Sequence, residues 1–311
     1  MIGMKLTNKK YTREEINLLA LNPKEFLDDC SYDYHSGVSE VAEIIHNDKN
    51  KKIVMLAGPS CSGKTTTAKL LSDMLIKRGN KAYTVSLDDF YHPRSVGYPL
   101  DENGKPDYEC VEALDIELLH SCFGELLKKG SAEFPVFDFQ SGDRINKAKK
   151  LELSENDVII VEGLHALNPV ITETLDENRL YRIYVSVSSR VYEENGEVLL
   201  SKRDLRFTRR LVRDYAFRST SPERTFEIWQ SVMKGEDKYL FPFEENADIK
   251  LNSFHPCEPC VLSEKAIKLL ETVKTGEHRE KATLLIDKLM QFRNTDYSIL
   301  PEDSLLREFT G

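Results

Sequence analysis

The segment Gly58–Thr65, with the sequence GPSCSGKT, constrains this chain more than any other part of it. It follows the apolar run Ile53–Ala57 and matches the phosphate-binding P-loop pattern Gly-x-x-x-x-Gly-Lys-Ser/Thr at every constrained position. A P-loop joins a buried strand to a helix, and the helical pattern Lys64–Lys77 follows directly. The sequence therefore predicts an α/β fold with a site for a nucleoside triphosphate.

The residues of this P-loop differ in what they offer a nucleotide. Gly58 and Gly63 allow the backbone to curl so that successive N–H groups point at phosphate oxygens. Lys64 would bridge the β- and γ-phosphates, and the Thr65 hydroxyl would hold Mg²⁺. The residues expected to bind the nucleotide are Gly58, Pro59, Ser60, Cys61, Ser62, Gly63, Lys64, Thr65 and Thr66.

Composition and charge limit the partners of this chain. Its 311 residues are 40% hydrophobic and carry a net charge of −9, whereas a nucleic-acid surface is usually basic. No segment approaches the roughly twenty apolar residues of a membrane span, and the six scattered cysteines fit a reducing compartment. We therefore expect a cytoplasmic protein without a nucleic-acid or membrane partner. The sequence is compatible with a monomer or a homo-oligomer.

Short apolar segments alternate with helical patterns, which is typical of a parallel sheet flanked by helices. The expected strands are Ile53–Ala57, Ala82–Leu87, Val136–Phe139, Val158–Glu162, Tyr181–Val187 and Asp248–Leu251. The expected helices are Lys64–Lys77, Val111–Lys128, Lys202–Phe217, Pro222–Lys234, Ser263–Thr275 and Glu280–Phe292. The basic run 147–150 is expected to form a solvated turn. We expect a helical arm over 1–50, a P-loop core over 51–262 with an arginine-rich lid near 202–235, and a helical extension over 263–311.

Acidic residues follow two of the expected strands, at the edge where open α/β sheets bind ligands. Asp88 and Asp89 come after the strand Ala82–Leu87, and Glu162 ends the strand Val158–Glu162. In phosphoryl transfer an Asp can accept the proton of the attacking hydroxyl. We expect Asp88 to be this base and Asp89 to be structural. Glu162 would contact Mg²⁺ or its water shell, or else would hydrogen-bond the neighbouring loop.

The expected helix Lys202–Phe217 carries arginines at a spacing that places them on one face, namely Arg206, Arg209, Arg210 and Arg213. In an acidic chain such a stripe suits a highly charged anion, as when a lid closes over a phosphate in transfer. The alternative is a solvated face whose arginines pair with Asp204 and Asp214.

These stretches together resemble the uridine kinase and phosphoribulokinase family of P-loop kinases, from about Lys51 to Asn252. The motifs that carry the resemblance are the P-loop, LDDFYHPR (Leu87–Arg94), VEGLHALNP (Val161–Pro169) and RFTRRLVRD (Arg206–Asp214), in the expected order. A uridine kinase-like subgroup is also indicated by KPDYE (Lys105–Glu109), FPFEENAD (Phe241–Asp248) and the tail LLREF (Leu305–Phe309).

The resemblance implies a P-loop kinase architecture that uses ATP and Mg²⁺ to phosphorylate a small acceptor. It implies that Asp88 is the catalytic base, that Lys64 and Thr65 serve phosphate and metal, and that Glu109 and Glu162 are metal-shell or acceptor-side acids. The lid arginines would be Arg206, Arg209 and Arg210. The acceptor would contact Tyr91, Tyr108, Glu109, Phe137 and Arg144.

Two positions depart from that family. Gly142 occupies the place of a histidine that reads the base in uridine kinases, and Arg224 lies near the place of a base-reading glutamine. The resemblance favours the 5′-hydroxyl of a nucleoside as acceptor, whereas Arg224 would favour a sugar phosphate or another anionic acceptor. A P-loop ATPase switch without a small acceptor is a further alternative. Guanine recognition is disfavoured because Lys149 stands where the Asn-Lys-x-Asp motif needs its aspartate.

Overall fold

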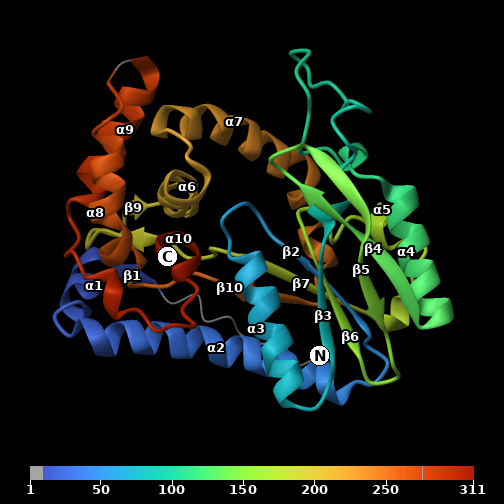
Figure 1. Cartoon of the computed structure of the whole chain (residues 1–311). Helices are drawn as coiled ribbons and strands as arrows, with labels where there is room; N and C mark the ends of the chain where they lie inside the picture. The colour runs from blue at the N-terminus through green and yellow to red at the C-terminus, as the bar shows by residue number, and fades with distance from the viewer. Residues whose placement is uncertain (1–9, 275) are drawn as a thin grey trace.

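The computed structural model describes residues 10–274 and 276–311; Thr275 and residues 1–9 of the expected arm lie outside this part. A five-stranded parallel sheet occupies the centre, in the order β10-β7-β2-β6-β3 (Figure 1). Its strands are β2 (Ile53–Ala57), β3 (Ala82–Ser86), β6 (Val158–Glu162), β7 (Leu180–Ser186) and β10 (Ile249–Asn252). Five of the six expected strands are therefore confirmed, as is the α/β fold.

Each face of the sheet has its own hydrophobic core because successive residues of a strand point to opposite faces. Val54 and Leu56 of β2 belong to the larger core, with α2 (Pro23–Asn47) and α3 (Lys64–Lys77). Ile53 and Met55 belong to the second core, with α4 (Ile116–Lys129). The β2 strand is buried along its whole length, so the loop that follows it starts from a fixed position.

The expected strand Val136–Phe139 is not part of the central sheet. It lies in β4 (Ser131–Asp138), which pairs antiparallel with β5 (Asp143–Glu152) in a separate hairpin. Pro135 lacks a backbone N–H, and the register shifts between Phe134 and Val136. The basic run 147–150 is exposed as expected, but it lies in β5 and forms no turn.

The terminal segments of the chain pack on the same side as α3. The larger core combines residues from both ends of the chain with α6 (Lys202–Arg218) and α8 (Glu258–Leu270) (Figure 1). The other elements on this side are β1 (Tyr11–Thr12), α1 (Arg13–Leu19), β8 (Val191–Tyr192), β9 (Val198–Leu200), α7 (Pro222–Tyr239), α9 (Gly276–Leu289), η5 (Tyr297–Ile299) and α10 (Arg307–Thr310). The short elements elsewhere are η1 (Leu87–Phe90), η2 (Val111–Ala113), α5 (Pro169–Thr172), η3 (Glu177–Arg179) and η4 (Phe241–Asn246). Within the described residues, no helix combines the length and apolarity required to cross a membrane.

Candidate active site

The P-loop turns sharply between β2 and α3, and its glycines are required by the geometry. Gly63 caps α3 in the left-handed region, with φ of +86°, and Cys61 is also left-handed, with φ of +58°. A Cβ atom at Gly58 would lie 2.1 Å from the carbonyl oxygen of Val185. The first-turn N–H groups of α3 have no partner inside the helix, so this turn can hold an anion.

Three acids lie within electrostatic reach of Lys64, whose amino group donates to the carbonyl of Pro59 at 3.3 Å. They are Asp88 in η1, Glu162 at the end of β6 and Glu109 in the loop before η2. Burial raises the pKa of Asp88, and the nearby Lys64 and Arg218 oppose that rise. Burial raises the pKa of Glu109 to about 7. The arrangement places a cation among carboxyl groups that hold protons more tightly than usual.

Glu162 and Thr65 form a cluster of oxygen atoms beside the P-loop. The Thr65 hydroxyl lies 3.4 Å from Glu162 Oε1, and Ser86 Oγ donates to the same oxygen at 3.0 Å. Burial raises the pKa of Glu162, and the nearby Lys64 opposes that rise. Hydroxyl and carboxylate oxygens are the ligands that Mg²⁺ prefers, so these two residues fit that ion.

Aromatic side chains form a cluster that begins three residues after Asp88, at Tyr91. Tyr91 donates a hydrogen bond to the carbonyl of Tyr108 at 2.8 Å, and its ring lies 5.6 Å from that of Phe137. Tyr98 packs on Tyr108, with ring centroids 4.8 Å apart. Glu109 lies directly under α7, because a Cβ atom at Gly235 would lie 2.5 Å from that of Glu109. The structure thus brings together Tyr91, Tyr108, Glu109 and Phe137, and adds Tyr98, which the sequence analysis missed.

Arg144 pairs with Phe137 across the hairpin, but its guanidinium is held by Asp115 at 3.0 Å. Gly142 has φ of +70°, and a Cβ atom there would lie 2.2 Å from Nε of Arg94. Arg94 also donates from its backbone to Gly142 O and from Nη2 to Phe139 O. The space beside Gly142 is therefore filled by Arg94, whose position in the site the sequence analysis did not anticipate.

Arg224 does not lie with the acceptor residues, and its expected role there is wrong on the geometry. Its side chain is 63% exposed and binds Glu227 at 2.8 Å on the surface of α7. Gly235, which contacts Glu109, is about three turns, or roughly 16 Å, further along this helix. The helix carries Arg224 away from the cleft because α7 runs across the molecule toward α9 (Figure 1).

Most of the arginine stripe on α6 is buried, so a solvated face is wrong, but the expected pairing with Asp214 is present for Arg210 and Arg213. Arg206 donates to Ser60 O at 2.9 Å and forms an ion pair with Glu236. Arg210 donates to Ser60 Oγ at 2.8 Å and contacts Asp214 at 3.1 Å. Arg206 and Arg210 thus hold the P-loop from the side of α6.

Arg209 has a different position from its two neighbours. Its side chain is fully buried, pairs with Glu258 and donates to the carbonyls of Cys61 and Ser253. A lid arginine must reach a phosphate, and this guanidinium is already bonded behind the P-loop. We therefore correct the expectation of a catalytic Arg209: its contacts are those of a residue that supports the P-loop.

Besides Arg94, sequence reasoning missed two further charged residues near the site. Arg218, one turn after Asp214 on α6, lies within electrostatic reach of Asp88. The continued four-residue spacing from Arg206 through Arg210 and Asp214 could have identified it. Glu308 of the C-terminal tail accepts a hydrogen bond from Thr66. It belongs to the tail motif LLREF, but that motif did not indicate a contact with the P-loop because the two segments are far apart in the sequence.

Comparison with known proteins connects this geometry with phosphoryl transfer. The family model for the Phosphoribulokinase / Uridine kinase family matches residues 53–257. The uridine kinase of Halobacterium salinarum is 29% identical over 195 residues, which cover 62% of this chain and 76% of that protein. The uridine kinase of Ligilactobacillus salivarius is 28% identical over 206 residues, covering 65% and 86% respectively.

Solved structures resemble the fold. A protein from Silicibacter sp. TM1040, named as a fructose transport system kinase, superposes with a TM-score of 0.50 and 19% identity. The match covers 68% of this chain and 98% of that one. At this identity the likeness concerns the arrangement of the sheet and its helices.

Proposed function

This chain belongs to the phosphoribulokinase/uridine kinase family, and on that premise we propose that it transfers the γ-phosphate of ATP to the 5′-hydroxyl of a nucleoside. The observation that carries the proposal is that Asp88, Glu109 and Glu162 all lie within electrostatic reach of the P-loop Lys64, next to the aromatic contact of Tyr91 with Phe137. A cation next to a candidate base suits phosphoryl transfer to a hydroxyl, because catalysis rests on positioning and on charge stabilisation.

Asp88 is the proposed general base. Its carboxylate would take the proton of the acceptor hydroxyl as the oxygen attacks phosphorus, and would later release that proton to water. Burial raises the pKa of Asp88 and thus its basicity, and Lys64 opposes that rise. Thr65 and Glu162 are the residues that would hold Mg²⁺, which supplies charge neutralisation on the phosphates when bound.

Lys64, Arg206 and Arg210 have separate proposed tasks. Lys64 would neutralise charge on the transferred phosphate, since its amino group lies among the acids of the cleft. Arg206 and Arg210 would fix the P-loop backbone and side chain at Ser60. Holding the donor in a defined geometry lowers the barrier by removing the need to order it during the reaction.

The nucleoside acceptor is supported by the uridine kinase relatives and by the Tyr and Phe side chains beside Asp88. A second candidate, an anionic acceptor such as a sugar phosphate, is favoured by Arg94, because its guanidinium fills the place beside Gly142. Replacement of Arg94 by Ala distinguishes the nucleoside acceptor from the anionic acceptor. It should raise KM for an anionic acceptor about tenfold or more, with KM for ATP unchanged.

The test of the proposed function is ADP production from ATP with a panel of nucleosides, nucleotides, sugars and sugar phosphates. We expect turnover that depends on an added nucleoside. ADP formation at the same rate without any acceptor would contradict the proposal and favour an ATPase switch.

A further inference from the structure

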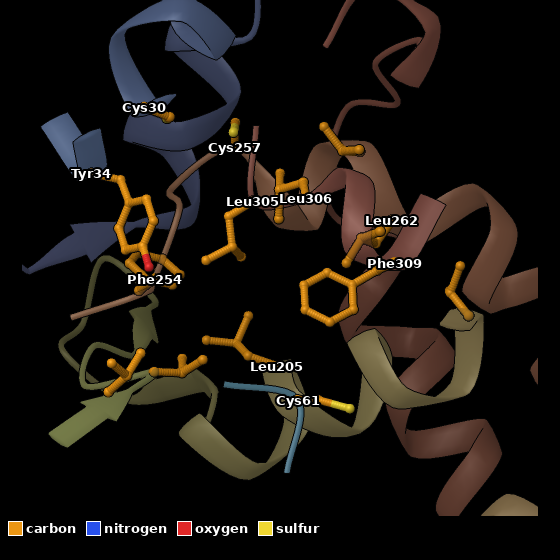
Figure 2. Close-up of a cluster of buried hydrophobic side chains, with 14 of the residues drawn as sticks. Cys30, Tyr34, Cys61, Leu205, Phe254, Cys257, Leu262, Leu305, Leu306 and Phe309 are labelled. Carbon is orange, nitrogen blue, oxygen red and sulfur yellow. The ribbon is translucent and has the colours of Figure 1, made fainter. Parts of the chain in front are cut away.

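The C-terminal tail, residues 300–311, contacts the P-loop although it lies outside the region that matches the family. A Cβ atom at Gly63 would lie 2.5 Å from Cδ1 of Leu305, so the Leu305 side chain covers this glycine. Oε2 of Glu308 accepts a hydrogen bond from the Thr66 hydroxyl at 2.5 Å. Figure 2 shows Leu305 and Phe309 in the same buried cluster as Cys61 of the P-loop.

This tail is a fixed part of the fold. Leu305, Leu306 and Phe309 are completely buried, and Phe309 lies under the guanidinium of Arg209. Lys265 of α8 donates to the carbonyl of Thr310, which anchors the end of the tail. Freeing three buried side chains would destabilise the chain strongly, so the tail is not a flap that opens in each turnover.

The position of Glu308 relative to the P-loop limits what it can bind. The transferred phosphate must lie between Lys64 and Asp88, so the rest of the nucleotide extends away from Asp88. Thr66 follows the metal-binding position Thr65 in the first turn of α3, on the helix end that holds phosphates. Glu308 contacts this turn at Thr66 and lies within electrostatic reach of Glu162. Because Thr66 is one residue further from the metal position Thr65, we infer that the nucleoside continues on the side of Glu308.

The chemistry of a carboxylate selects the nucleotide group that can contact it. An ionised carboxylate only accepts hydrogen bonds, and the phosphates of a bound nucleotide have only acceptors. Ribose hydroxyls are the nearest donors that a nucleotide carries beyond its phosphates. Arg213 of α6 lies within electrostatic reach of Glu308.

We propose that residues Leu305–Gly311 form the wall of the nucleotide site beside the first turn of α3, with Glu308 accepting a hydrogen bond from a ribose hydroxyl. The inference rests on the proposed function, because it requires a nucleoside triphosphate in the P-loop. It assigns a role in binding ATP, the phosphate donor, to a segment outside residues 53–257, which match the family model.

Calorimetric binding of ATP, 2′-deoxy-ATP and 3′-deoxy-ATP to the full chain tests this inference without an acceptor. We expect at least one deoxynucleotide to bind the wild-type chain roughly ten- to a hundredfold more weakly than ATP, as for a lost hydrogen bond to a charged group. Glu308→Ala should weaken ATP binding by the same factor and remove the discrimination. Glu308→Gln keeps an acceptor oxygen and should retain part of the discrimination between ATP and the deoxynucleotide. Glu302→Ala, at an exposed position of the same tail, should bind like the wild type.

Discrimination that persists in folded Glu308→Ala, or ATP binding that becomes tighter in it, would overturn the inference. Tighter binding would mean that Glu308 only repels phosphate. Thermal unfolding shows whether each variant is folded. If Glu308→Ala does not fold, nucleotide binding of Glu308→Gln is compared with that of the wild type instead. If the wild-type chain bound none of the three nucleotides, the proposed function itself would fail, which separates the two conclusions.

Discussion

At the scale of single residues, the site depends on carboxyl groups whose surroundings alter their affinity for protons. Asp88 and Asp89 are adjacent in the sequence but have different partners. Asp89 accepts a hydrogen bond from the backbone of Phe137 at 3.2 Å, as a structural residue does, whereas Asp88 faces Lys64. The difference follows from η1, which turns successive side chains in different directions.

Replacement of Asp88 by Asn should therefore lower the maximal rate by about two to four orders of magnitude, because proton acceptance is lost in the transition state. ATP affinity should change little. Asp89→Asn serves as the matched control and should reduce the rate far less, since an amide oxygen can still accept from Phe137. Steady-state kinetics of both variants make the comparison, and the reverse order of effects would show that Asp89 is the base.

The raised pKa of Glu109 makes stability depend on pH. Its folded pKa of about 7 exceeds the ordinary value of 4.5, so the folded state binds the proton more tightly than the unfolded state does. The stabilising contribution is complete below pH 4.5 and is lost as the pH rises through 7. It amounts to about 3 kcal/mol at most.

Urea unfolding of the wild type and Glu109→Gln at pH 5 and pH 8 measures this contribution. The variant cannot ionise at this position, so its stability relative to the wild type should increase from pH 5 to pH 8. Asp88 lies within electrostatic reach of Glu109, so its titration also contributes to the difference. A difference that is the same at both pH values would contradict the assignment.

At the scale of elements, the sequence predicts the helices and strands that are determined by residues within or next to the element itself. The strand, P-loop and helix around Lys64 follow from an apolar run, two glycines and a helical pattern, and α3 has the expected bounds Lys64–Lys77. The strand Val136–Phe139 was misassigned to the central sheet because an apolar segment does not show which strand it pairs with. It pairs instead with the next strand in the chain, β5, in a hairpin joined by residues 139–142.

The arginine stripe of α6 also shows that a sequence pattern does not identify the partner of a residue in the fold. Helical spacing correctly places these arginines near one another, but it cannot tell which of them meets a buried acid from another element. Arg209 meets Glu258 of α8, and Arg206 meets Glu236 of α7. Arg224 was misplaced for the same reason, since its distance from the cleft is set by the direction of α7.

The buried pair of Arg209 and Glu258 should matter for stability. Arg209→Ala leaves the Glu258 carboxylate buried without its partner, which should reduce the free energy of unfolding by roughly 3–5 kcal/mol. Arg203, half-exposed and paired with Asp237, is the control on the same helix, and Arg203→Ala should cost less than about 1 kcal/mol. Denaturant unfolding measures both values. Near wild-type stability of Arg209→Ala would contradict the supporting role.

At the scale of the whole molecule, the site joins parts of the chain that are far apart in sequence. The P-loop, the acids at the sheet edge and α6 all belong to the region that matches the family, and their motifs are visible in the sequence. The tail with Leu305 and Glu308 reaches the same P-loop from the other end of the chain. Its place could not be predicted because it depends on how the terminal helices share the larger core.

The central claim, phosphoryl transfer to a nucleoside, is tested most directly by following the γ-phosphate itself. The full chain is incubated with Mg²⁺, ATP labelled in the γ-phosphate and a mixture of nucleosides, and the products are separated and identified by mass spectrometry. The account predicts label in a nucleoside 5′-monophosphate, and a loss of this product in Asp88→Asn. Label found only as inorganic phosphate, or on a sugar phosphate added in competition, would contradict it.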